Sequence, residues 1–217
     1  MYLPSHFEET RSEVLRAFMR EHPLGTIVVS DDGSLSADHV PLHLRPDQGP
    51  RGTLIGHVAR ANPLWRKAAT AGDGGLDALV LFQGTQHYIS PGWYASKAKD
   101  GRVVPTWNYA VVHVHGRMKP MDDGAWLRGM LEELTGLHEA GRSPPWRMDD
   151  APEDYVAKMM RAIVGIEIEI LGLVGKFKLS QNKSAQDQDS MIHGLLADGS
   201  PEAAEMAGVM QSQRQDS

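Results

Sequence analysis

The stretch YISPGWYASKAKDGRVVPTWNY, residues 88–109, is unusually rich in aromatic and basic side chains for a chain with only 6% aromatic residues. It holds two of the five tryptophans and three of the five tyrosines, together with two prolines and three cations. Flat apolar surfaces, turns fixed by proline and clustered hydrogen-bond donors suit a planar, anionic ligand such as a flavin mononucleotide (FMN). An aromatic-rich turn that merely closes a β-sheet has the same composition, so both interpretations stay open on this stretch alone.

Working outward from this stretch, apolar segments on both sides of it predict strands. The clearest is the alternation of Ile166, Ile168 and Ile170 with two glutamates, which we expect to continue toward Leu179. The predicted strands cover residues 24–29, a segment that ends near 44, 53–58, 76–82, 86–90, 109–118 and 166–179. Six or seven strands joined by mostly short connections favour an antiparallel β-barrel over a parallel, doubly wound sheet.

Helices are expected around this sheet. Residues 7–21 form an amphipathic pattern, and residues 122–141 place apolar side chains at helical spacing. Further helices are predicted over residues 152–161 and 191–196, with short ones beginning near 62 and 200. The expected fold class is therefore mainly β with peripheral helices (α+β).

Composition excludes several kinds of site. The 217-residue chain has no cysteine, which rules out disulfides, thiol catalysis and cysteine-bound metals. Its net charge of −6 repels nucleic acid on average, so DNA binding would need a local basic patch. No signal peptide, membrane span or glycine-rich nucleotide-binding fingerprint is evident, so we expect a cytoplasmic protein that does not enter the membrane.

Three short motifs carry candidate binding residues. In GHVARANP, residues 56–63, Arg60 lies where a strand meets a helix, a place suited to a phosphate. In PTWNY, residues 105–109, Thr106 and Asn108 share one face of an extended chain, while Trp107 points to the other. In KFKLSQN, residues 176–182, two cations on one face precede two amides. Each motif alone is equally compatible with an ordinary surface.

Ten histidines raise the possibility of a metal site. His113 and His115 project to one side of a predicted strand, and His39 and His43 do the same on theirs. Zinc or iron would need a third ligand, such as Glu167 or Glu169, but nothing in the spacing locates it. Core or interface histidines are the better interpretation, so we predict no metal.

The chain resembles the PaiB family of FMN-binding negative transcriptional regulators, whose domain is similar to the split β-barrel of pyridoxamine phosphate oxidases. The motifs that carry the resemblance lie in one order over nearly the whole chain to about Leu196. They are the opening Met1-Tyr2 with Pro4, His6 and Phe7, GHVARANP (56–63), YISP (88–91) with Trp93-Tyr94 and Lys97, VPTWNY (104–109), and Gly175-Lys176 with KLSQN (178–182). Phe177 stands where tryptophan is expected.

The resemblance implies a homodimer with an FMN at the interface between two barrels. Residues 1–182 would then be the FMN-binding split-barrel domain, which includes inserted helices over 122–161, and residues 183–217 a C-terminal helical extension. Arg60 and Lys97 are expected to bind the phosphate. Thr106, Trp107 and Asn108 are expected to line the ring or the ribityl chain, and Gln181 and Asn182 to close the site.

Other functions remain open on the sequence. An FMN-dependent oxidoreductase would only need to position its flavin, so it need not show a separate catalytic acid. A haem-binding or haem-degrading barrel would use His113 or His115 as the axial ligand. A flavin-free barrel that binds a partner protein is a further alternative. Regulation through DNA follows from the resemblance alone, because the acidic chain offers no helix suited to a DNA groove.

Overall fold

The computed structural model describes residues 1–31 and 33–215, in which eight strands form one sheet. The strand order is β3-β2-β6-β7-β8-β5-β4, and β1 pairs with β8 beside this path. The pairs β1–β8, β2–β3, β2–β6, β4–β5 and β5–β8 are antiparallel. The strands are β1 (Glu8–Glu9), β2 (Leu24–Asp31), β3 (Ser34–Pro41), β4 (His43–Arg45), β5 (Thr53–Ala59), β6 (Leu76–Ile89), β7 (Thr106–Met121) and β8 (Ile163–Lys178).

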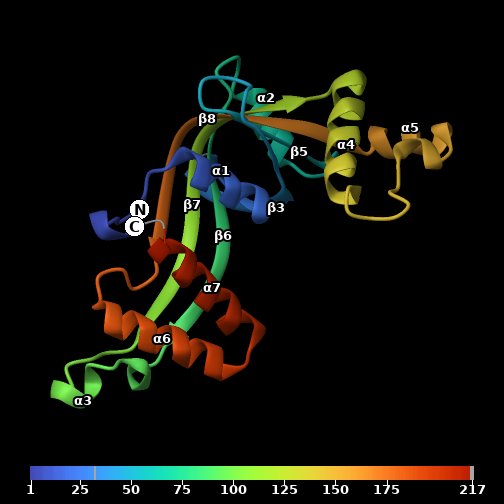
Figure 1. Cartoon of the computed structure of the whole chain (residues 1–217). Helices are drawn as coiled ribbons and strands as arrows, with labels where there is room; N and C mark the ends of the chain where they lie inside the picture. The colour runs from blue at the N-terminus through green and yellow to red at the C-terminus, as the bar shows by residue number, and fades with distance from the viewer. Residues whose placement is uncertain (32, 216–217) are drawn as a thin grey trace. The chain divides into compact units, whose positions relative to one another are not determined.

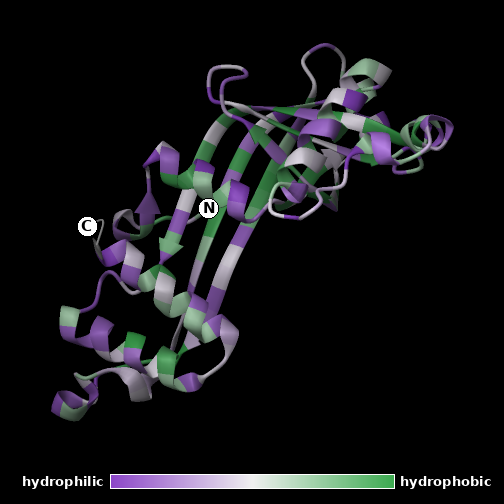
Figure 2. Ribbon diagram, turned by 45° about the vertical axis from the view of Figure 1, so that its right-hand side comes forward, coloured by the Kyte–Doolittle hydropathy of each residue, from purple (hydrophilic) through white to green (hydrophobic). Residues whose placement is uncertain are grey.

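Helices surround this sheet, which confirms the expected class, mainly β with peripheral helices (Figure 1). In Figure 2 the hydrophobic colour is strongest along the strands, whereas the helices carry both colours. Among the described residues, every helix is too short or too polar to cross a bilayer. The α-helices are α1 (Ser12–Glu21), α2 (Leu64–Thr70), α3 (Lys97–Asp100), α4 (Gly124–Glu139), α5 (Glu153–Arg161), α6 (Ala185–Asp198) and α7 (Pro201–Gln215), and the 3-10 turns are η1 (Ser5–Phe7), η2 (Pro91–Trp93) and η3 (Met148–Asp150).

The chain forms two compact units that interleave along the sequence. Unit 1 contains residues 1–18, 83–112 and 174 onward, and unit 2 contains residues 19–82 and 113–173. Helices α6 and α7 thus belong to the same unit as the start of β7 and the end of β8. The boundary near residue 182 that the sequence suggested stays a prediction.

The core of unit 2 follows the predicted strand alternation. Ile166 and Ile168 of β8 are fully buried, whereas Glu169, which follows Ile168, is exposed. On β5, Ile55 packs with Leu127 and Met130 of α4, so the helix expected over 122–141 covers the sheet with its apolar face. In unit 1, the rings of Phe18 and Phe177 pack with their centroids 5.3 Å apart, and α6 and α7 bury methionines and leucines against one another.

Four predicted elements differ from the structure. The strand expected to end near residue 44 is divided into β3, which pairs with β2, and β4, which pairs with β5. The helix expected from residue 7 begins only at Ser12, because Glu8 and Glu9 pair with β8 instead and the Glu9 carboxylate binds Arg11. The strands expected over 76–82 and 86–90 are one continuous strand, β6, because the residues between them stay extended. The helix expected over 191–196 is longer and forms α6, since Ser184 caps its start by accepting a hydrogen bond from the Asp187 N–H.

Candidate functional site

A cavity of about 180 Å³ lies in unit 1. It is built where the start of β7 meets the end of β8 and the turn that follows, with the segment after η2 closing it. Its lining residues are Phe7, Tyr94, Val104, Thr106, Asn108, Lys178, Ser180, Asn182 and Lys183. Three predicted cofactor contacts, Thr106, Asn108 and Asn182, are therefore brought together from segments that lie more than seventy residues apart in sequence.

The alternation of β7 decides which side chains face this cavity. Thr106 and Asn108 point into it, as expected for residues two apart on a strand. Trp107 is not among the lining residues and is 48% exposed. Its indole N–H donates to Gln86 Oε1 at 3.1 Å, and its ring lies 6.2 Å from that of Tyr88. Within this chain, Trp107 thus forms an exposed aromatic surface with Tyr88.

Asn108 is the fully buried polar residue of the cavity wall. Its Oδ1 accepts a hydrogen bond from Ser180 Oγ at 3.0 Å, and its Nδ2 donates to Met210 Sδ of α7 at 3.5 Å. Ser180 has a backbone φ of +65°, a left-handed conformation that side chains other than glycine rarely adopt. The buried amide therefore ties β7, the turn after β8 and α7 together behind the cavity.

Lys178 provides the central positive charge of the cavity. Its Nζ donates to Thr106 Oγ1 and to the Trp107 carbonyl, each at 2.5 Å. Burial lowers the pKa of Lys178, and the charges of Lys176 and Lys183 lower it further. The oxygens that Lys178 contacts are neutral, so this ammonium group lies among cations and dipoles rather than against a carboxylate.

Lys183 and Tyr94 also line the cavity. The Lys183 Nζ lies 5.6 Å from the centroid of the Tyr94 ring. Asp187 lies near this pair, and the Ser96 backbone N–H that donates to it at 2.8 Å lowers the pKa of its carboxyl. Burial raises the pKa of Tyr94, and the charge of Asp187 adds to that effect. The site is thus electropositive, with one nearby acidic group that is already engaged.

The remaining predicted residues of unit 1 lie around this site in different roles. Gln181 closes its own turn, because its Oε1 accepts from the Leu179 N–H and its Nε2 donates to the Phe177 carbonyl. Asn182 is exposed at the cavity and offers its side chain to a ligand. Lys97 stands on the exposed α3 and is not among the lining residues.

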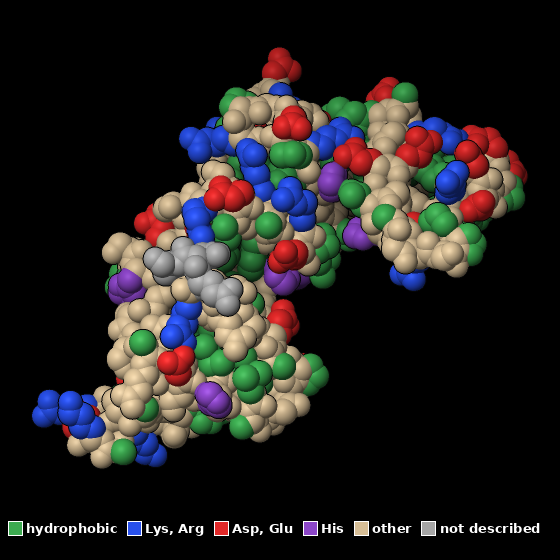
Figure 3. Space-filling model, viewed as in Figure 1, with side chains coloured by type: hydrophobic (Ala, Val, Ile, Leu, Met, Phe, Trp, Pro, Cys, Tyr) green, Lys and Arg blue, Asp and Glu red, His purple; other side chains and the backbone are tan. Residues whose placement is uncertain are grey.

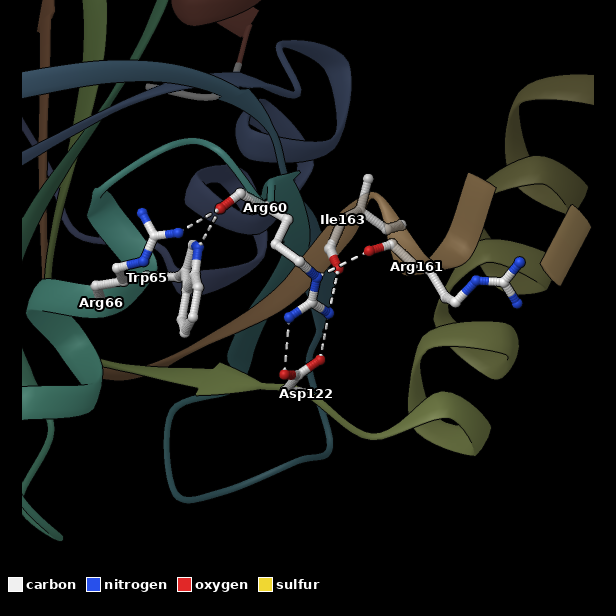
Figure 4. Close-up of polar contacts among 6 residues, drawn as sticks. All are labelled: Arg60, Trp65, Arg66, Asp122, Arg161 and Ile163. Atoms are coloured by element: carbon white, nitrogen blue, oxygen red, sulfur yellow. Dashed lines mark hydrogen bonds and ion pairs between the residues drawn. The ribbon is translucent and has the colours of Figure 1, made fainter. Parts of the chain in front are cut away.

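Arg60 lies in unit 2 and is held by several partners (Figure 4). Its Nη1 and Nη2 donate to the two carboxylate oxygens of Asp122 at 2.9 and 2.5 Å. Its Nε donates to the Arg161 carbonyl and its Nη2 also to the Ile163 carbonyl. The hydrogen bond to Asp122 raises the pKa of Arg60 and lowers that of Asp122. Arg60 lines a different cavity of about 290 Å³ beside α4 and α5, within unit 2, and is not among the residues that line the unit 1 cavity.

The four histidines that the sequence suggested as metal ligands, His39, His43, His113 and His115, lie in unit 2. His43 Nε2 lies 3.0 Å from Glu133 Oε1, and burial lowers the pKa of His113. No group of three or more His, Asp or Glu side chains that could hold a metal ion is found within the described residues.

Sequence reasoning missed Lys178, Ser180 and Lys183 as site residues. The spacing of Lys176 and Lys178 on a strand predicts two cations on one face. It does not predict that Lys178 donates a hydrogen bond to Thr106. The left-handed turn at Ser180 has no signal in a sequence that places no glycine there. Tyr94 lies inside the aromatic stretch that the sequence did single out.

Comparisons with known proteins agree with this architecture. Residues 1–171 match the family described as "Putative FMN-binding domain". The chain is 32% identical over 214 residues to the protease synthase and sporulation protein PAI 2 of Bacillus subtilis, covering 97% of each chain, which confirms the resemblance to the PaiB proteins. It is 34% identical over 226 residues to an uncharacterized protein of Emericella nidulans, covering 90% of each.

Among solved structures, the fold is similar to that of the FAD and haem binding protein from Mycobacterium smegmatis, with a TM-score of 0.58 and 19% identity. That alignment covers 89% of this chain and 80% of the other. At this identity the likeness concerns the fold alone. With its matched domain, its full-length PaiB relative and its mainly β architecture, the chain belongs to the FMN-binding domain family.

Proposed function

We propose that the protein binds FMN and that the unit 1 cavity receives part of this cofactor. The observation that carries the proposal is the convergence of Thr106, Asn108 and Asn182 with Lys178 around one electropositive cavity. A cofactor with a phosphate, a polyol and a ring edge needs charged and neutral donors together, and this cavity offers both. The family match includes the β7 residues of the site.

The chain's own residues would bind and orient the flavin, which supplies the redox chemistry when bound. Thr106, Asn182 and the two lysines of the cavity present polar groups to the ligand. Asn108 holds the wall in place through Ser180 and Met210, so the site is preorganised rather than assembled on binding.

We also propose that the site is completed in a homodimer. A volume of about 180 Å³ is small beside the roughly 300–1,000 Å³ of cavities that enclose a whole ligand of this size. The cavity of one chain therefore holds only a portion of an FMN. Exposed apolar side chains on the same unit, among them Val104, Trp107 and Tyr88, provide a surface for a second copy. Arg60 and Lys97, which the resemblance implies for the phosphate, are not among the lining residues of this cavity.

The proposed cellular role is that of a cytoplasmic negative transcriptional regulator of the PaiB type. This role rests on the relationship to the PaiB proteins, and the absence of cysteines fits a reducing compartment. Lys97, Lys99 and Arg102 around α3 form an exposed basic tip on unit 1, visible as blue atoms over α3 in Figure 3. Contact with DNA phosphates at this tip would be strongly weakened by salt, and an unchanged affinity between low and high salt would argue against it.

Flavin binding is tested by titrating the purified protein with FMN and following flavin absorption and fluorescence together with the mass in solution. We expect one FMN per chain and the mass of a dimer. Asn182→Ala should weaken binding, whereas a substitution at exposed Leu35, on unit 2, serves as the matched control and should not. A protein that stays colourless and leaves the spectrum of added FMN unchanged would contradict the proposal.

A further inference from the structure

The charges around the unit 1 cavity do not balance. Lys178 and Lys183 both line the cavity, and the charges of Lys183 and Lys176 help to lower the pKa of Lys178. Asp187 is a nearby carboxylate, and the charge of Lys183 helps to lower its pKa. Asp187 is itself occupied by the Ser96 and Ser184 donors, which reduces its capacity to neutralise the lysines. The cavity thus favours an anionic ligand group.

The donors in the cavity suit a group with several acceptor oxygens. The Lys178 ammonium has three N–H donors, of which Thr106 Oγ1 and the Trp107 carbonyl take two. The Thr106 hydroxyl accepts from Lys178, so its own proton is directed elsewhere. Lys183 touches the Tyr94 ring face rather than a hydrogen-bonding partner. Several donors are thus available at one place.

The Arg60 site of unit 2 differs in this respect. Its guanidinium already makes a bidentate contact with Asp122 and donates to two carbonyls, which uses four hydrogen bonds (Figure 4). An anionic ligand at Arg60 would compete with Asp122, whereas the oxygens that Lys178 contacts are neutral.

We propose that Lys178 and Lys183 bind the terminal phosphate of the flavin, so that the phosphate end occupies the unit 1 cavity and the ring lies beyond its mouth. A phosphate monoester carries about −1.5 to −2 charges near neutral pH, which the two lysines of the cavity can neutralise. The small volume admits a phosphate more readily than a tricyclic ring. The inference rests on FMN being the ligand, and it makes the cavity selective for FMN over riboflavin.

The test compares FMN with riboflavin, which differs from it only by the phosphate, on the full-length chain. The unsubstituted protein should bind FMN far more tightly than riboflavin. Lys178→Met and Lys183→Met should each weaken FMN binding by roughly 10- to 100-fold, as expected for hydrogen bonds to a charged group, and leave riboflavin affinity within about twofold. Lys97→Met, which removes the same charge outside the cavity, is the matched control and should change neither.

Two results would overturn the inference. Equal losses for FMN and riboflavin in Lys178→Met would place the ring or the polyol at this lysine. A selective loss of FMN binding in Arg60→Met, with Lys178→Met unaffected, would place the phosphate in unit 2. Far-ultraviolet circular dichroism and thermal unfolding of each variant check that it is folded, and Lys178→Arg keeps the charge if Lys178→Met does not fold.

A failure of FMN binding as such is distinguishable from a failure of this inference. If the unsubstituted protein binds neither flavin, the proposed function fails, but binding of inorganic phosphate can still be followed by phosphorus NMR. Phosphate binding that is lost in Lys178→Met and kept in Lys97→Met would support the anion site independently of the flavin. No phosphate binding in the unsubstituted protein would reject the site as well.

Discussion

Arg60 and Lys178 each lie among hydrogen-bonding groups, and their two sites differ in what neutralises the cation. In unit 2, Arg60 is paired with Asp122 and its pKa is raised. In unit 1, Lys178 contacts only neutral oxygens and its pKa is lowered. Asp122 neutralises the cation of the first site, which we call the closed site. The cation of the second site, which we call the open site, remains available to an anion. Which cation is available to a ligand is thus decided by partners that are distant in sequence.

The largest effect is expected from removing the Asn108 side chain, whose hydrogen bonds support the wall of the unit 1 cavity. Asn108→Ala leaves Ser180 Oγ without its acceptor and opens a gap beside Met210, so we expect a loss of about 1–3 kcal/mol in the free energy of unfolding, with weaker FMN binding. Urea denaturation measures the first quantity. Asn182→Ala, the same substitution at an exposed position of the same cavity, should leave stability almost unchanged. Equal losses of unfolding free energy in both variants would show that the Asn108 hydrogen bonds do not support the cavity wall.

The pH dependence of FMN binding tests the difference in charge between the Lys178 site and the Arg60 site. Because the pKa of Lys178 is lowered from the ordinary value near 10.5, its ammonium is fully charged only at pH values below the depressed pKa. FMN affinity should therefore be complete at neutral pH and fall as pH rises through that pKa, before ordinary lysines titrate. Titrations between neutral and alkaline pH test this. In Lys178→Met the decline should disappear, and a decline of the same size would assign it to another group.

The strained turn at Ser180 gives a smaller effect. Ser180→Ala and Ser180→Gly both remove the hydroxyl that donates to Asn108 Oδ1. Only glycine relieves the strain of the left-handed backbone at φ +65°. We expect the glycine variant to be more stable than the alanine variant by about 1 kcal/mol. The two midpoints of urea denaturation give this difference directly. A more stable alanine variant would show that the turn is not strained.

The smallest effect is expected at the closed site. Asp122→Asn removes a pair whose side chains are 37% and 52% exposed, so solvent screening should leave little change in unfolding temperature. The pKa of Asp122 is lowered, so the contribution of the pair is present above the ordinary carboxyl value near 3.8 and is lost as pH falls through the depressed pKa. High salt should also remove the contribution of this pair, and thermal unfolding with and without salt measures the change. A large destabilisation at neutral pH would mean that the pair is structural.

Much of this fold could be predicted because its patterns are local. The alternation of Ile166, Ile168 and Ile170 identifies β8, and helical spacing identifies α4. The ends of elements depended on distant partners, as where pairing with β8 prevented the first helix from starting at Phe7. Thr106 and Asn108 could be placed on one face from their spacing. Lys178 could not be placed beside Thr106, because that contact joins residues 72 apart in sequence.

A crystal structure of the protein grown with FMN tests the central claim most directly. The account predicts a phosphate within hydrogen-bonding distance of Lys178 Nζ, in the cavity lined by Thr106 and Asn108, with Arg60 still paired to Asp122. A flavin whose phosphate is held by Arg60 while the unit 1 cavity contains only water would contradict it.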